Sequence, residues 1–188
     1  MKSWHILILF VILTLLLTYP MIVQLNTHLA GRDNDVWINP WADWWLLKAL
    51  GEGQDPYYTD YLFYPQGVSL AFHSFSPLNT LFVSVLQPFV GSMVAYNIVV
   101  LSAYVLSGYG MWCLASYLTG SRYAGLLAGV VFAFAPYHMI EGAHPVISST
   151  QWMPFFMLYL IKVVQEGCAR CGWLAGLFLG LGPLLGNI

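Results

Sequence analysis

The most prominent feature of the sequence is a series of long apolar runs separated by shorter polar connections. The first run covers residues 6–23; as a helix it would measure about 27 Å, close to the roughly 30 Å hydrocarbon core of a bilayer. Further runs follow at residues 77–90, 93–118, 123–140, 146–164 and 172–188. This pattern predicts an all-α fold, a polytopic bundle of transmembrane helices.

The run at residues 77–90 is an exception, because as a helix it would measure only about 21 Å and it contains Asn79 and Pro88. Basic residues favour the cytoplasmic side, and those outside the first loop are Lys2, Arg122, Lys162 and Arg170. All four are cytoplasmic if the other five runs cross and residues 77–90 lie along the membrane or re-enter it. We therefore expect about five spans, a cytoplasmic N-terminus and an external first loop. The alternative keeps residues 77–90 as a short sixth span and reverses everything downstream.

Composition agrees with a membrane protein. The 188 residues are 59% hydrophobic and only 7% charged, whereas a soluble domain has about 25% charged residues. This excludes most soluble enzyme classes, and six scattered basic residues offer no surface for nucleic acid. We expect one membrane domain over residues 1–188, with residues 6–23 as the first span, residues 24–92 as an external loop and residues 93–188 as four further spans.

Charged residues gather in the expected external loop, where eight of the fourteen lie: Arg32, Asp33, Asp35, Asp43, Lys48, Glu52, Asp55 and Asp60. Asp33 and Asp35 have the spacing of a D-x-D motif at the point where the chain leaves the first span. Such a pair can bind a divalent cation, and desolvation beside a membrane makes a carboxylate a better base. The alternative is an ordinary solvated acidic loop.

A short tryptophan-rich helix is predicted inside this loop. Asn39 is the expected N-cap, Pro40 the first helical residue and Gly51 the stop. Helical spacing places four side chains on one face: Trp41, Trp44, Trp45 and Lys48. Such a helix would lie at the boundary between water and lipid. Its indoles either anchor the helix there or stack against a sugar or a lipid-linked substrate.

A second polar group, His138, Glu141 and His144, lies between Pro136 and Pro145. The expected topology puts it on the same external side as Asp35, so these side chains would be the ligands of a divalent metal ion or part of an acid–base site. An equally simple interpretation is a polar loop at a helix end.

Cys168 and Cys171 form a C-x-x-C pair without a second pair at matching spacing, which favours a structural role over a redox or zinc site.

Several stretches together resemble a known enzyme family. In chain order they are the acidic motif from Gly31 to Asp35, PWADWW, DPYYTDYLFYPQGVSLAFHSFSPLN, and LSGYGMWCLASYLTGSRYAGLLAGVVFAFAPY. This order resembles the N-terminal part of bacterial polytopic glycosyltransferases of the GT-C superfamily, whose relatives include protein mannosyltransferases and aminoarabinose transferases. The resemblance covers nearly the whole chain, and its most specific parts are YPQG and SGYGM.

The resemblance implies sugar transfer from a polyprenyl-phosphate donor on the outer face of the bacterial inner membrane. In the family an aspartate at the start of the first external loop is the general base on the acceptor hydroxyl; Asp35 matches that position and Asp33 is the next candidate. Substrate contacts are expected from Trp41, Trp44, Trp45, Tyr64 and His73, and some relatives use further acidic or histidine residues where His138, Glu141 and His144 lie. The partners implied are membrane lipid and the lipid-linked sugar donor.

Family members generally have more spans and a further domain, so we expect this chain to be the N-terminal portion of such an enzyme. The alternative is a non-catalytic transmembrane subunit packed in a larger membrane protein complex. Small residues at helical spacing, which permit close helix packing, support that alternative. They are Gly125 and Gly129 in one run, and Gly172, Gly176 and Gly180 in another.

Overall fold

The computed structural model describes residues 3–31, 34–73 and 75–185, and the all-α prediction is confirmed. The helices are α1 (Ser3–Leu17), η1 (Met21–Val23), η2 (Asn34–Trp37), α2 (Ile38–Glu52), α3 (Pro77–Val90), α4 (Ser92–Thr119), α5 (Arg122–Ala133), α6 (Pro136–Ile140), η3 (Glu141–Ala143), α7 (Pro145–Ser148), α8 (Trp152–Glu166), α9 (Ala169–Leu181) and η4 (Pro183–Leu185). Within the described residues, strands are limited to a two-residue antiparallel pair, β1 (Tyr58–Thr59) and β2 (Val68–Ser69).

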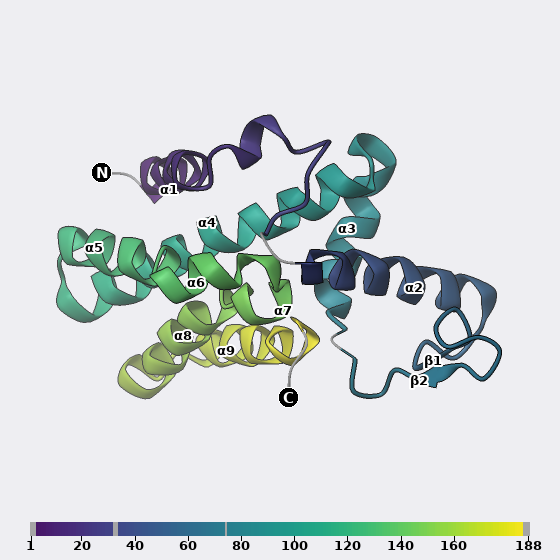
Figure 1. The fold of residues 1–188 in the computed structure, drawn as a ribbon. Helices are drawn as coiled ribbons and strands as arrows, with labels where there is room; N and C mark the ends of the chain where they lie inside the picture. The colour runs from purple at the N-terminus through teal and green to yellow at the C-terminus, as the bar shows by residue number, and fades with distance from the viewer. Residues whose placement is uncertain (1–2, 32–33, 74, 186–188) are drawn as a thin grey trace.

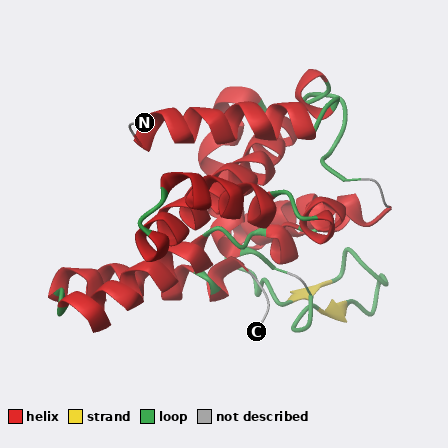
Figure 2. Cartoon of the chain, turned by 90° about the vertical axis from the view of Figure 1, so that its left-hand side faces the viewer, coloured by secondary structure: helices red, strands yellow, loops and turns green. Residues whose placement is uncertain are grey.

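The long helix α4 forms the centre of the fold (Figure 1). Helix α5 folds back along α4, the α8–α9 hairpin packs on one side, and α1 packs on the other. Helices α2 and α3 gather near the N-terminal end of α4, away from the turn that joins α4 to α5. Figure 2 shows the two strands on a loop that projects from the helices. The fold therefore has a helical body and, at one end, an appendage built from the first long loop.

Helix α4 has 28 residues and is the one helix in the described part of the chain that is both long and apolar enough to cross a membrane. The apolar helices α1, α3, α5 and α9 have between 12 and 15 residues, below the roughly 17 to 25 that a span needs. Proline explains part of the shortening: α5 ends at Ala133 and a new short helix begins at Pro136, because proline lacks the N–H that would continue the ladder.

The boundaries expected for the tryptophan-rich helix are wrong by one or two residues. Helix α2 begins at Ile38 after an N-cap at Trp37, which makes no side-chain capping bond, so Asn39 is not the cap. At the other end α2 runs through Gly51 and stops at Gly53, whose φ of 67° is left-handed. Glycine adopts that conformation at little steric cost, which makes Gly53 the effective stop.

Close contact between helices depends on glycines in α4 and α5. A Cβ atom added to Gly108 would lie 2.5 Å from the Phe10 ring of α1, and one added to Gly129 would lie 2.6 Å from the Gly108 carbonyl oxygen. Phe10 is fully buried there beside Ile6 and Trp112. The predicted small-residue face of α5 is therefore used inside the chain. In α9, by contrast, a Cβ added to Gly176 or Gly180 meets no atom of the described residues within 4 Å, apart from the local helix backbone.

This difference predicts opposite effects of the same substitution. Gly129→Ala is expected to destabilise the protein by about 1 to 3 kcal/mol, because the methyl group overpacks the contact. Gly176→Ala meets open space and is expected to be neutral or to stabilise by up to about 1 kcal/mol through helix propensity. Thermal unfolding of both variants in the same detergent measures this. A loss of stability of equal size in both would contradict the packing described.

Cys168, the N-cap of α9, and Cys171 in the first turn of that helix form a disulfide, with their Cα atoms 5.3 Å apart. The C-x-x-C pair is thus a local covalent link at the start of α9.

Candidate functional site

Asn97 of α4 attaches the beginning of the first loop to the helical body. Its side-chain oxygen accepts a hydrogen bond from the Ala30 N–H at 3.0 Å, and its amide group donates to the carbonyl oxygens of Leu25 and His28, both at 2.8 Å. Asn97 is completely buried. One side chain therefore determines the path of residues 25–30, which lead directly to the acidic motif.

The two candidate catalytic aspartates follow this segment. Asp33 lies outside the described residues. Asp35 lies in η2, which ends at Trp37. The structure describes the backbone of Asp35 but not its side chain.

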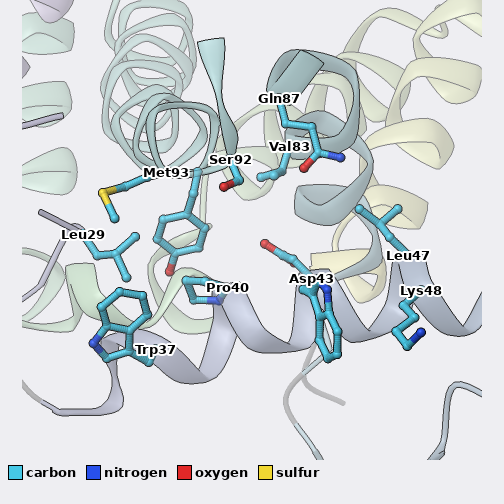
Figure 3. A pocket seen from close by; sticks show the side chains of 12 residues that line it. Leu29, Trp37, Pro40, Asp43, Leu47, Lys48, Val83, Gln87, Ser92 and Met93 are labelled. Atoms are coloured by element: carbon cyan, nitrogen blue, oxygen red, sulfur yellow. The ribbon is translucent and has the colours of Figure 1, made fainter. Parts of the chain in front are cut away.

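Directly after η2, a pocket of about 440 Å³ lies between α2, α3 and the start of α4 (Figure 3). One wall is formed by Trp37, the last residue of η2, and by Pro40, Trp44 and Leu47 of α2. Val83 of α3 and Met93 of α4 lie across from it. The volume is in the range of pockets that hold a small organic molecule. Because Trp37 is both the end of η2 and part of the wall, Asp35 is two residues from this pocket along the chain.

Asp43 is the buried acid of the pocket. It is only 7% exposed, and Figure 3 shows its carboxyl directed from α2 into the space toward α3 and α4. The Thr80 hydroxyl donates a hydrogen bond to it at 2.6 Å. Burial raises the pKa of Asp43 from 3.8 to about 6, and the Thr80 hydrogen bond opposes this only in part.

Comparisons of the chain with protein-family models, with curated proteins and with solved structures found no match.

Other polar groups line the same pocket. Tyr96 of α4 is 4% exposed, and its hydroxyl is buried without a hydrogen-bond partner in the described structure. Gln87 and Ser92 lie on the wall opposite α2. Lys48 also lines the pocket, but its ammonium binds Glu52 and lies 5.6 Å from the centre of the Tyr61 ring. The hydrogen bond to Glu52 raises the pKa of Lys48.

The three predicted tryptophans have different surroundings. Trp45 is 1% exposed, packs with Ala42, Ala49, Leu70 and Phe75, and donates its indole N–H to the Pro56 carbonyl at 2.9 Å. Trp41 stacks on Trp45 with a ring separation of 6.4 Å. Trp44 lines the pocket. Of the three, only Trp44 has a position suited to contact a ligand in this pocket, while Trp45 anchors the following loop to α2.

The two remaining candidate binding residues, His73 and Tyr64, lie in different surroundings. His73 packs edge-on against Trp41, with ring centres 5.6 Å apart, and burial lowers the pKa of His73. Tyr64 is 80% exposed in the loop between β1 and β2. The structure thus brings His73 into the aromatic cluster of α2 and leaves Tyr64 outside it.

The second polar group does not form a metal centre by itself. Both ring nitrogens of His138 face backbone carbonyls, Nδ1 at 2.8 Å from Ala133 and Nε2 at 2.5 Å from Ser148, whereas a histidine ligand must offer one nitrogen lone pair to the metal. Glu141 and His144 lie 3.1 Å apart as a pair. Among the described residues, no group of three or more His, Cys, Asp or Glu side chains is arranged to hold a metal ion.

Asp43 was not among the expected site residues. Its position three residues after Pro40 and four before Leu47 puts it on the helix face that now lines the pocket. A carboxylate on this helix face is the signal that could have identified Asp43. It was missed because an acidic residue in the first turns of a helix is also explained by its favourable interaction with the helix dipole.

Proposed function

We propose that this chain is the N-terminal part of a polytopic membrane glycosyltransferase, which transfers sugar from a polyprenyl-phosphate donor to an acceptor hydroxyl on the external face. The observation that carries the proposal is the pocket beside η2, where apolar and indole walls surround a buried carboxyl group. Such a lining suits an amphiphile whose polar end lies at the membrane boundary. Part of its wall, at Pro40, Asp43 and Trp44, comes from the PWADWW stretch that contributes to the resemblance to the GT-C superfamily.

The distribution of basic residues supports five spans. The Tyr117 hydroxyl near the end of α4 donates to Glu166 at 2.7 Å, and the Lys162 ammonium lies 5.0 Å from the Tyr117 ring centre. The C-terminal ends of α4 and α8 therefore meet, far along α4 from the acidic loop. Arg122 and Arg170 lie at the starts of α5 and α9, the helices that follow these two ends. One cytoplasmic end for all three basic residues is what the positive-inside rule requires.

Exposed apolar side chains support a lipid environment around this bundle. On α1, α5 and α9, large hydrophobic side chains point outward, among them Leu16, Leu127, Val131, Trp173 and Leu177. So many exposed large apolar side chains favour a surface covered by lipid or by another protein. Helix α3 packs beside the start of α4. In the proposed arrangement it lies along the membrane surface and does not cross.

The proposed chemistry assigns the proton transfer to Asp35. Its carboxylate takes the proton of the acceptor hydroxyl as the acceptor oxygen bonds to the anomeric carbon of the sugar, and the bond from that carbon to the polyprenyl phosphate breaks. The lipid phosphate leaves with the electron pair. Asn97 acts as a positioning residue, because it holds the segment that precedes Asp35.

Asp35→Asn is expected to reduce sugar transfer at least about a hundredfold, because an amide cannot accept the proton. The measurement is incorporation of labelled sugar from a polyprenyl-phosphate donor in membranes that contain the protein. Asp55→Asn is the matched control, since Asp55 lies in an exposed turn where it accepts only the local Tyr57 N–H. Unchanged transfer by Asp35→Asn would contradict the assignment.

The open face of α9 favours a second candidate function, a non-catalytic subunit of a larger membrane complex. Among the described residues, no atom outside the local α9 backbone lies within 4 Å of a Cβ built at Gly176 or Gly180, and small residues of this kind let another helix approach closely. Stoichiometric recovery of another membrane protein with the wild-type chain, lost with Gly176→Leu, would support this role in place of transfer.

A further inference from the structure

The carboxyl group of Asp43 faces the pocket without a cationic partner. Among the described residues, no lysine, arginine or histidine pairs with it, and its one hydrogen bond comes from Thr80. Lys48 is the nearest candidate along α2, but its ammonium is bound to Glu52, and Figure 3 shows it directed away from the Asp43 carboxyl. A buried ionised group normally has a counter-charge, and the described residues supply none to Asp43.

The walls indicate what kind of cation fits. Asp43 is the single carboxylate among the residues that line the pocket, and no group of three or more His, Cys, Asp or Glu side chains among the described residues is arranged to hold a metal ion. Three aromatic side chains share the pocket with Asp43: Trp37, Trp44 and Tyr96. Aromatic faces attract organic ammonium groups through cation–π interaction, and indole is the strongest of them.

The buried Tyr96 hydroxyl supports the same ligand. It has no partner in the described structure, although a buried hydroxyl normally forms a hydrogen bond. An ammonium N–H can donate to the hydroxyl oxygen while another donates to the Asp43 carboxylate. One ligand would therefore satisfy both groups that the fold leaves without adequate partners.

We propose that the pocket between α2, α3 and the start of α4 binds an alkylammonium group, held by the Asp43 carboxylate, the Tyr96 hydroxyl and the indoles of Trp37 and Trp44. This chemistry is available in the headgroup of an ethanolamine phospholipid or in a free amine. The mouth of the pocket is open, since Trp37 is 61% and Trp44 45% exposed. The inference concerns the pocket of the proposed function but requires no sugar transfer, so the two can fail separately.

The test compares short-chain lipids that differ only in the headgroup. Isothermal titration of the purified full chain in detergent uses dihexanoylphosphatidylethanolamine, dihexanoylphosphatidylglycerol and free ethanolamine. The ethanolamine lipid is expected to bind at least about tenfold more tightly than the glycerol lipid, which corresponds to one charge-assisted hydrogen bond. Equal affinity for free ethanolamine would identify the source as a free amine, and weak binding of free ethanolamine would identify it as a lipid headgroup.

Variants locate the site. Asp43→Asn is expected to weaken binding of the ethanolamine ligand roughly ten- to hundredfold, and Trp44→Leu by about threefold or more. Asp55→Asn, which removes a carboxylate outside the pocket, is expected to leave the affinity unchanged. Circular dichroism checks that each variant keeps its helical content.

Three results would overturn the proposal. The first is equal affinity for the ethanolamine and glycerol lipids. The second is unchanged affinity in Asp43→Asn, and the third is the absence of binding by either ethanolamine ligand to the wild-type protein. None of these depends on whether Asp35 supports transfer.

Discussion

Replacing Asn97 with leucine is expected to lower the free energy of unfolding by about 3 kcal/mol and to release residues 25–30 from α4. The substitution nearly preserves volume but removes one acceptor and two donors. The Ala30 N–H and the carbonyls of Leu25 and His28 then lose their partners at a buried position. Thermal unfolding in detergent measures the stability, and limited proteolysis measures the release of the segment.

Ser102→Ala serves as the control for this prediction. Ser102 also lies in α4, but its hydroxyl bonds only the Val99 carbonyl of the same helix at 2.7 Å. Its removal is expected to cost less than about 1 kcal/mol. Equal loss of stability in the two variants, or unchanged proteolysis of Asn97→Leu, would contradict the attachment of the loop by Asn97.

Asp43→Asn is expected to make the protein more stable than the wild type at pH 8, by up to about 3 kcal/mol. The folded state raises the pKa of Asp43 from 3.8 to about 6, so the folded protein binds this proton more tightly than the unfolded chain. Wild-type stability therefore decreases as pH rises from about 4 to 6 and levels off above that range. Asparagine carries no such charge and still accepts the Thr80 hydrogen bond.

The measurement is the unfolding free energy of wild type and Asp43→Asn at several pH values between 4 and 8. The two proteins are expected to be similar near pH 4 and to diverge toward pH 8. Asp55→Asn provides the control, because its carboxylate is in an exposed turn. An Asp43→Asn protein that is less stable than wild type at pH 8 would show that the carboxylate is not penalised by burial.

The apolar pattern predicted the boundaries of two helices closely. The run at residues 93–118 became α4, Ser92–Thr119, and the run at residues 77–90 became α3 with the same bounds. Elsewhere an expected span was too long. The run at residues 123–140 divides into α5 and α6 at Pro136, because hydropathy averages over a residue that the backbone hydrogen-bond ladder cannot include.

The candidate site was predicted in its general place and only partly in its residues. The tryptophan helix, expected at the boundary of the first loop, forms one wall of the pocket. The sequence did not distinguish the roles of the tryptophans, because Trp44 and Trp45 are identical in type and adjacent in the chain. Of these two, only Trp45 packs in the hydrophobic cluster between α2 and the following loop. The burial of Asp43 could not be predicted from the local sequence, because it results from α3 and α4, more than thirty residues away.

The sequence by itself determined that the chain is helical, that its first long loop carries most of its charge, and that glycines permit close helix contacts. These are consequences of composition and short-range periodicity, which act within one or two helical turns. Only the tertiary structure decided that Gly129 is packed and Gly176 open, that Asn97 holds the first loop, and that Asp43 is the buried acid. Each of these depends on which distant segment covers a side chain, because burial and desolvation are properties of the packed chain.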